Sequence, residues 1–129
     1  MSSFLDSNVL LYLLASGPKS LRARELLGQG GTISVQVLNE FVAVARRKLK
    51  LRFEDIESGL ELVRAHCEVA DLTLAVHERA VEFAKSTNIE IYDCNIIAAA
   101  ELLGCDVLYT EDLNNGQRVG GVTIRNPFA

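Results

Sequence analysis

Four acidic side chains occupy positions at which α/β proteins build functional sites. Asp6 ends a short apolar segment, Asp112 follows another by two residues, and Asp93 stands just before the apolar run of an alanine-rich segment. In open parallel sheets, sites form beyond the carboxyl ends of the strands, where these three residues are expected. Glu40 lies on or beside the apolar stripe of a predicted helix, with no lysine or arginine between residues 31 and 44 to pair with it.

Each carboxylate also has a purely structural interpretation. Asp6 and Asp93 can cap helices, Asp112 can serve a turn, and Glu40 can be a half-buried surface residue. If the fold brings the four together, two carboxylates about 5 Å apart repel by roughly 3 kcal/mol at an effective dielectric near 20. A divalent cation is the natural compensation, and an all-oxygen set without nearby histidine or cysteine favours Mg²⁺ or Mn²⁺. Such an ion polarises a phosphodiester and favours a hydroxide nucleophile, so phosphodiester hydrolysis is the expected chemistry.

The elements that must position these acids alternate between short apolar strands and helices. Strands are predicted at 3–6, 32–34, 68–72, 106–110 and 119–124, and helices at 9–15, 19–27, 35–49, 53–67, 74–86 and 92–103. Ser7 and Asn8 are expected to cap the first helix, and Ser34 the third. The alternation predicts an α/β fold, a three-layer α/β/α domain with a short, mainly parallel central sheet over residues 1–129.

Composition limits the class of protein. The chain has 129 residues, 49% hydrophobic content and a net charge of −4, which fit one ordinary domain and exclude an overall basic nucleic-acid coat. Its longest apolar run, residues 9–15, is far shorter than the ~20 residues of a membrane span. It also lacks the preceding basic region of a secretory signal, so we expect a cytoplasmic protein. Cys67, Cys94 and Cys105 are widely spaced and are expected to be buried free thiols.

The one concentrated positive charge is the basic segment, residues 46–52, at the predicted carboxyl end of a helix. Its charged side chains are Arg46, Arg47, Lys48, Lys50 and Arg52. The helix dipole favours cations at this end, so a solvated helix terminus explains the segment. Contact with phosphates is the functional alternative, and the sequence leaves both open.

Four short motifs resemble the conserved segments of PIN domains, in particular of the VapC-type toxins of prokaryotic toxin–antitoxin pairs. They are residues 4–10 (FLDSNVL), 34–41 (SVQVLNEF), 92–100 (YDCNIIAAA) and 108–112 (LYTED). Their order and spacing match the family over nearly the whole chain, as far as the Asn-Pro-Phe sequence at 126–128.

The resemblance implies a Rossmann-like PIN fold and a metal-dependent ribonuclease. By this resemblance, the catalytic and metal-binding residues are Asp6, Glu40, Asp93 and Asp112. They would hold Mg²⁺ or Mn²⁺ and cleave single-stranded or looped RNA. Family membership also implies a homodimer and a cognate antitoxin as partner.

Hydrogen-bonding residues beside the acids are implied as well. Ser7 and Asn8 would orient Asp6 or a metal-bound water, and Thr110 would play a similar part. Many relatives carry another acid a few residues past the fourth motif, where this chain has asparagines at 114 and 115. This departure puts a second metal site in doubt. Glu111 is the possible substitute, but as the neighbour of Asp112 it is expected to point elsewhere.

Other protein classes fit the residues less well. A haloacid-dehalogenase-type phosphatase also has Asp after its first strand, but it needs a second Asp where this chain has Asn8. A response-regulator receiver domain needs paired early acids and a late lysine, and neither is visible. A non-catalytic PIN-like scaffold that binds RNA or a protein is the remaining alternative, although it would have no chemical need for all four acids.

Overall fold

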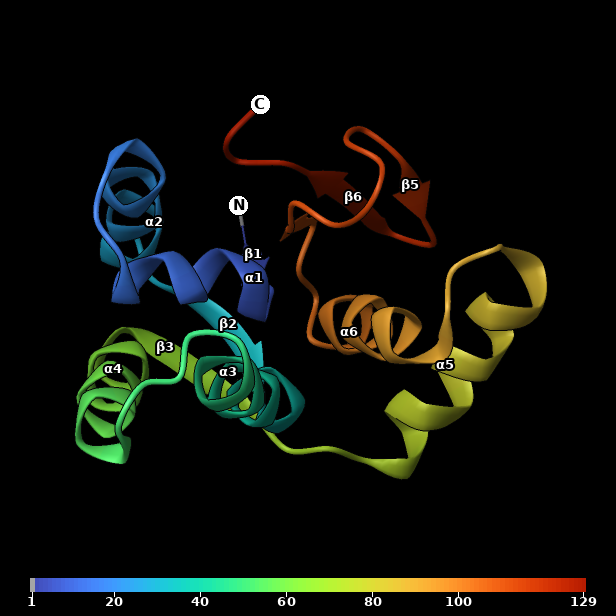
Figure 1. The fold of residues 1–129 in the computed structure, drawn as a ribbon. Helices are drawn as coiled ribbons and strands as arrows, with labels where there is room; N and C mark the ends of the chain where they lie inside the picture. Colours follow the sequence, from blue (N-terminus) through green and yellow to red (C-terminus); the bar gives the residue numbers. More distant parts are fainter. Residues whose placement is uncertain (1) are drawn as a thin grey trace.

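A six-stranded sheet runs through the molecule, with α2 on one side of it and α3 and α6 on the other (Figure 1). The computed structural model describes residues 2–129. In chain order the elements are β1 (Ser3–Leu5), α1 (Ser7–Leu10), the 3₁₀ helix η1 (Leu11–Leu14), α2 (Pro18–Gly28), β2 (Gly31–Ser34), α3 (Val35–Arg47), α4 (Phe53–His66), β3 (Cys67–Ala70), α5 (Leu74–Ser86), α6 (Ile91–Leu102), β4 (Val107–Tyr109), β5 (Arg118–Val119) and β6 (Val122–Arg125). The predicted α/β fold is confirmed.

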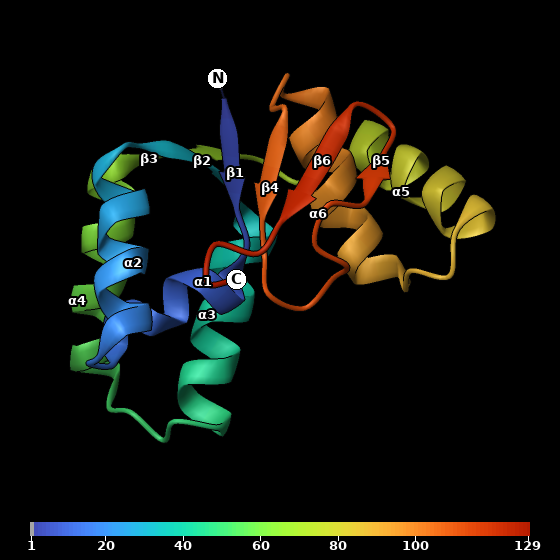
Figure 2. The same ribbon diagram turned by 90° about the horizontal axis from the view of Figure 1, so that it is seen from above.

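The sheet is parallel through its centre. Its strand order is β3-β2-β1-β4-β6-β5, and β5 pairs antiparallel with β6. Leu5 of β1 lies opposite Tyr109 of β4, and Phe4 lies opposite Thr32 of β2. Because β1, β2, β4 and β6 run in the same direction, their carboxyl ends meet at one edge, where α1 and α3 begin (Figure 2). The register therefore fixes which residues become neighbours at that edge.

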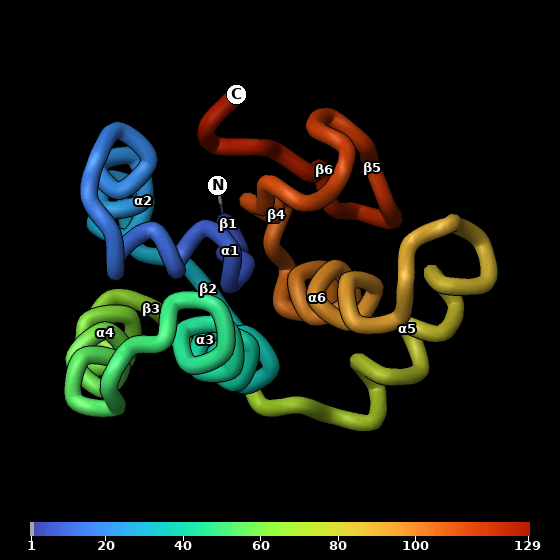
Figure 3. The backbone as a smooth tube through the Cα atoms, in the orientation of Figure 1, coloured from blue at the N-terminus to red at the C-terminus, as the bar shows by residue number. Residues whose placement is uncertain are grey.

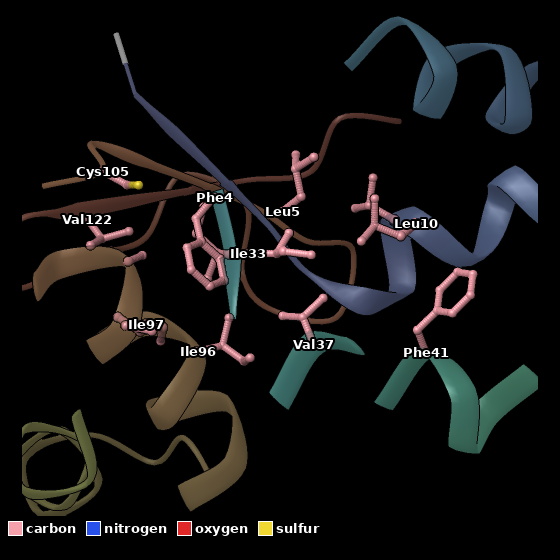
Figure 4. Packing of buried hydrophobic residues seen from close by; sticks show 14 of the residues in the cluster. Phe4, Leu5, Leu10, Ile33, Val37, Phe41, Ile96, Ile97, Cys105 and Val122 are labelled. Atoms are coloured by element: carbon pink, nitrogen blue, oxygen red, sulfur yellow. The ribbon is translucent and has the colours of Figure 1, made fainter. Parts of the chain in front are cut away.

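Apolar side chains from the strands and from the inner faces of the helices form the core (Figure 4). Phe4 and Ile33 on adjacent strands and Ile97 on α6 are fully buried. The consecutive alanines 98–100 of α6 are also buried, and these small side chains let the helix lie close to β2, β4 and β6. Helix α5 packs against α6. Cys67 is half-buried, Cys94 and Cys105 are buried, and all three are free thiols as predicted.

The predicted final strand, 119–124, is wrong because the chain reverses within it. Gly120 has a φ of 56°, in the left-handed region that favours glycine, and a Cβ there would collide with the side chain of Glu101. Oε2 of Glu101 accepts the Gly121 N–H at 2.9 Å, which fastens the turn to α6. The segment is a hairpin, β5–β6, in which β6 alone pairs with β4.

The first helix also differs from its prediction. It is a short α1 followed by η1, and its cap is Asp6 rather than Ser7 or Asn8, which lie inside α1. Ser34 caps α3 as predicted, by accepting the Val37 N–H at 3.4 Å. Helix α6 begins at Ile91, one residue earlier than predicted.

The last residues of the chain return to the first helices (Figure 3). Arg22 of α2 donates to the carbonyl oxygen of Pro127 at 3.1 Å. The rings of Phe128 and Tyr12 meet edge to face, with centroids 5.0 Å apart. Within residues 2–129, every helix is too short or too polar to span a bilayer.

A buried glycine in α4 sets how closely that helix approaches α3. A Cβ at Gly59 would lie 2.9 Å from Cδ2 of Leu14 and 3.1 Å from Cζ of Phe41. We therefore expect Gly59→Val to lower the free energy of unfolding by about 1–3 kcal/mol through overpacking. Glu57→Val, at an exposed position of the same helix, is the matched control. Urea unfolding of the two variants measures the difference, and equal stabilities would contradict this account of the α3–α4 contact.

Candidate functional site

The pairing of β1 with β4 brings two polar residues together directly beyond the strands. The Asp6 N–H donates to the carbonyl oxygen of Tyr109 at 3.0 Å, which extends the ladder by one step. Thr110 therefore lies beside Asp6, and its hydroxyl donates to Oδ2 of Asp6 at 3.0 Å. Both residues are buried, with 5% of Asp6 and none of Thr110 exposed.

Asp6 is a buried carboxylate that is held on both of its oxygens. The backbone N–H of Ser7 donates to Oδ1 at 2.7 Å, and Oδ2 accepts from Thr110 and, at 3.5 Å, from the Asn8 amide. Burial raises the pKa of Asp6 above its usual value, and nearby Asp112 adds to the rise. The hydrogen bonds from Ser7 and Thr110 oppose it. The carboxylate is thus fixed in position and costly to ionise.

Asn8 and Thr110 connect this centre to the loop that follows β4. The Asn8 amide donates to Oγ1 of Thr110 at 2.9 Å, and Oδ1 of Asn8 accepts the Glu111 N–H at 3.2 Å. Oγ1 of Thr110 also accepts the Asp112 N–H at 3.3 Å. These bonds fix the backbone on either side of Asp112, although the Asp112 side chain itself is exposed.

Glu111 points away from the acids, as the sequence predicted. Its Oε1 accepts from the hydroxyl of Tyr12 at 2.5 Å, and its Oε2 pairs with Nζ of Lys19 at 3.0 Å. Although burial raises the pKa of Glu111, the bonds from Tyr12 and Lys19 outweigh it and hold that pKa below its usual value. Glu111 is therefore occupied by α2 and η1 and does not replace the acid missing at positions 114 and 115.

Helices α3 and α6 each add a half-buried acid to the same edge. Glu40 lies on α3, and Asp93 lies in the first turn of α6. The amide of Gln36 on α3 donates to the carbonyl oxygen of Tyr92 at 3.0 Å, which ties the two helices together. Glu90 caps α6 by accepting the backbone N–H groups of Tyr92 and Asp93 at 3.2 and 2.9 Å.

The four predicted acids share one electrostatic environment. Burial raises the pKa of Glu40 to about 7, and the charges of Asp6, Asp93 and Glu90 contribute to the rise. Burial likewise raises the pKa of Asp93 to about 6, with contributions from Asp6, Glu90 and Asp112. The charges of Asp6, Asp93 and Asp112 thus disfavour ionisation of other acids of the set, as expected where like charges gather.

This set of donors fits a hard divalent cation in its chemistry. Carboxylate oxygens at a partly open edge are the ligands that Mg²⁺ and Mn²⁺ prefer. Within residues 2–129, no group of three or more His, Cys, Asp or Glu side chains stands close enough to hold an ion as it is. The acids are therefore electrostatic neighbours rather than a finished set of ligands.

Two surface depressions meet at Asp112. The first, which we name the basic depression, includes Glu40 together with Arg47 and Lys48 of the basic segment. The second is lined by Asp93 and by side chains from the α5–α6 and β4–β5 connections. The acids thus lie between a cationic surface and one without lysine or arginine among its described lining residues.

Other charges of the basic segment are engaged locally. Arg46 donates to the carbonyl oxygen of Leu51 at 2.9 Å and stacks on the ring of Phe53, 4.5 Å from its centroid. Arg52 pairs with Glu54 and Asp55 of α4 at 3.3 and 3.4 Å. Lys50 is exposed and takes a φ of 54° in the turn before α4. Only part of the segment therefore faces the acids.

Several residues that shape the site were missed by the sequence analysis. Gln36 and Glu90 position α6, and Tyr12 and Lys19 hold Glu111. Glu90 stands three residues before Asp93, the spacing of a helix cap, so its role could have been found. The partners of Gln36, Tyr12 and Lys19 are distant in the sequence, and no local pattern points to them.

The sequence model of the PIN domain matches residues 3–120. The chain belongs to the PIN domain family. This PIN domain resembles a toxin–antitoxin complex from Klebsiella pneumoniae with a TM-score of 0.75 and 18% identity, over 98% of both chains. It resembles the VapBC2 structure from Rickettsia felis, bound to a promoter DNA fragment, with a TM-score of 0.73 and 23% identity, also over 98% of both chains.

A third solved relative is VapC20 from Mycobacterium tuberculosis, described as a toxin that cleaves the sarcin–ricin loop. The TM-score is 0.70 and the identity 18%, over 86% of this PIN domain and 90% of that chain. At such identities these likenesses show a shared fold. No curated protein matches the sequence at a significant level.

The raised pKa values predict that ionisation of the acid cluster lowers the free energy of unfolding as the pH rises. Since Asp93 binds its proton more tightly when folded (pKa about 6 against 3.8), its contribution to stability falls as pH rises from about 4 to about 6 and is level above that range. At pH 8 without metal, we expect Asp93→Asn to raise the free energy of unfolding by about 1–2 kcal/mol, after allowance for screening at a half-exposed group. At pH 4 the gain should vanish.

Urea unfolding in EDTA at both pH values measures this effect. Asp106→Asn, an exposed aspartate at the opposite end of β4, is the matched control and should show no such pH-dependent gain. A gain of equal size at both pH values would contradict the electrostatic explanation.

Proposed function

We propose that this PIN domain is a Mg²⁺- or Mn²⁺-dependent endoribonuclease and the toxin of a toxin–antitoxin pair. The observation that carries the proposal is the gathering of Asp6, Glu40, Asp93 and Asp112 at one edge of the sheet, where the charges of Asp6, Asp93 and Asp112 raise the pKa of other acids of the set. Membership of the PIN domain family and a fold shared with VapC toxins support it.

The chain's own residues prepare the site. Ser7 and Thr110 hold the Asp6 carboxylate in one orientation, which lowers the cost of using it as a ligand. Glu40, Asp93 and Asp112 are partly exposed and supply the remaining oxygens. A bound Mg²⁺ or Mn²⁺ would neutralise these charges and polarise the phosphodiester of the substrate.

The basic depression supplies the electrostatic attraction for RNA. Arg47 and Lys48 line it together with Glu40 and Asp112. Since the chain is acidic overall, these cations attract a phosphate backbone that the rest of the surface repels. Arg46, Lys50 and Arg52 belong to the same segment, and the internal bonds of Arg46 and Arg52 leave Arg47 and Lys48 as its main RNA contacts.

The solved relatives support the proposal of a protein partner. The structures from Klebsiella pneumoniae, Rickettsia felis and Salmonella typhimurium are toxin–antitoxin complexes, the last with 24% identity and a TM-score of 0.68. We propose a cognate antitoxin for this chain on that basis, and a homodimer and a cytoplasmic location as for VapC-type toxins.

The deciding experiment is cleavage of a mixed pool of structured RNAs by the purified protein. With Mn²⁺ we expect internal cuts, and with EDTA none. Asp6→Asn should lower the rate by a factor of about 100 or more, because it removes the charge of the central carboxylate. Asp106→Asn should cut like the wild type. If folded, antitoxin-free protein leaves the pool intact, the non-catalytic RNA- or protein-binding scaffold is favoured.

Cation binding gives a second expected outcome that is independent of any RNA. A ligand present at about 100 times its Kd adds about 2.7 kcal/mol to the free energy of unfolding. We therefore expect Mn²⁺ and Mg²⁺ to raise the Tm of the wild type and of Asp106→Asn, but not that of Asp6→Asn. Thermal unfolding with and without the ion measures it. An equal shift in all three proteins would place the ion elsewhere.

A further inference from the structure

The second depression beside the acids carries a set of amides that the proposed chemistry does not use. We name it the amide groove. Its described lining includes Asn88 from the α5–α6 connection, Asn114 and Gln117 from the β4–β5 connection, and the carboxylates of Glu90, Asp93 and Asp112. Because Asp93 and Asp112 belong to the acid cluster, the amide groove opens directly onto the place where a phosphodiester would be cut.

The three amides are free to bind a ligand. In residues 2–129, the side chains of Asn88, Asn114 and Gln117 form no hydrogen bond with another protein group, although Gln117 is half-buried. The neighbouring Asn115 behaves differently, since its Oδ1 accepts the Asn126 N–H at 2.9 Å. Amides that no other protein group engages can exchange their bonds to water for bonds to a ligand.

Both walls of the amide groove are held by hydrogen bonds to the backbone. On one wall, Gln117 donates its N–H to the carbonyl oxygen of Asn114 at 3.1 Å and accepts the Ile124 N–H at 2.8 Å. On the other wall, Oγ1 of Thr87 donates to the carbonyl oxygen of Phe83 at 2.7 Å and accepts the Ile89 N–H at 3.1 Å. The amides are therefore presented from fixed backbone, which lowers the entropic cost of binding.

The charge of the amide groove selects the kind of group that it can accept. Its carboxylates repel phosphate, and none of its described lining residues is cationic. An amide offers both a donor and an acceptor, the combination that matches the edges of nucleobases, and carboxylates accept from exocyclic amines. Single-stranded RNA exposes these edges. The phosphates find their match on the other side of Asp112, at Arg47 and Lys48.

We propose that the amide groove is a subsite for one unpaired base of RNA, that of a nucleotide next to the scissile phosphate, and that Asn114 and Gln117 read its edge. The RNA then crosses the acids with its backbone in the basic depression and this base in the amide groove. The proposal rests on the proposed ribonuclease function and names a determinant of its substrate preference.

The test measures binding in a background that does not cut. Proteins carrying Asp6→Asn are titrated, in EDTA, against fluorescent six-nucleotide RNAs that differ in one central base. We expect Asn114→Ala and Gln117→Ala each to raise the Kd for the preferred base roughly threefold to tenfold, and the double variant to remove the preference among the four bases. Gln117→Glu, which keeps the side-chain shape, should also lose the preference.

Two control variants separate this subsite from general effects. Gln29→Ala changes an exposed amide at the amino ends of the strands and should leave every Kd unchanged. Arg47→Ala with Lys48→Ala should weaken all four RNAs alike and reduce the dependence on salt. A double amide variant that keeps the base ranking and the Kd of the Gln29→Ala protein overturns the proposal.

Cleavage by the corresponding proteins with Asp6 intact distinguishes the two proposals. If no RNA is cut but the amide variants still lose base-dependent binding, the ribonuclease function fails and the base subsite stands. If RNA is cut and the amide variants cut at the same bases as the wild type, the subsite fails and the ribonuclease function stands. If the protein binds none of the four RNAs, the base subsite is overturned, and the cleavage result alone decides the ribonuclease function.

Discussion

A carboxylate buried at the end of the central strand is the constraint on which the rest of this PIN domain depends. Asp6 is almost fully covered, and burial of a charge is tolerated only when its oxygens are bonded. The Ser7 N–H and the Thr110 hydroxyl meet this requirement. Thr110 can do so only because β1 and β4 run in parallel with Leu5 opposite Tyr109. The register that pairs β1 with β4 therefore also places the hydroxyl that stabilises the Asp6 carboxylate.

Neighbouring residues in the loop after β4 are assigned to opposite tasks. Glu111 bonds to Lys19 and Tyr12 and fastens the loop to the first helices, while the exposed carboxylate of Asp112 contributes to the raised pKa of Asp6 and of Asp93. Glu111 thus anchors the loop, and Asp112 adds a carboxylate to the acid cluster. The same loop then continues to Asn114 and Gln117, so that acid and amide surfaces lie side by side. Acidic and amide side chains with different roles thus lie within a few residues of one loop.

Much of the fold and of the candidate site could be predicted from the sequence. The features that could not be predicted share one cause. Acids that directly follow apolar segments predicted the site edge, since parallel strands end together. The cap at Ser34 followed from local chemistry in the same way. The hairpin at Gly120 did not, because its apolar residues on both sides of the glycines resemble one strand until Glu101 of α6 is seen to hold the turn. The engagement of Glu111 likewise depends on contacts about ninety residues apart along the chain. Local sequence patterns predict where the acids lie along the fold. Only tertiary contacts show which acids are already bonded to other side chains.

The pairing of β4 with β6 has a consequence for synthesis on the ribosome. Thr110, which holds Asp6, is itself held by a bond from its N–H to the carbonyl oxygen of Arg125 at 3.0 Å. The first and last strands of the parallel centre thus meet across β4, and neither the early acid nor the late loop is ordered by its own half of the chain. A nascent polypeptide has all four acids by residue 112 but lacks the strand that fixes them. The bond that holds Thr110 therefore forms only after residue 125 has left the exit tunnel, so a nascent chain that already carries all four acids still lacks this part of the ordered site.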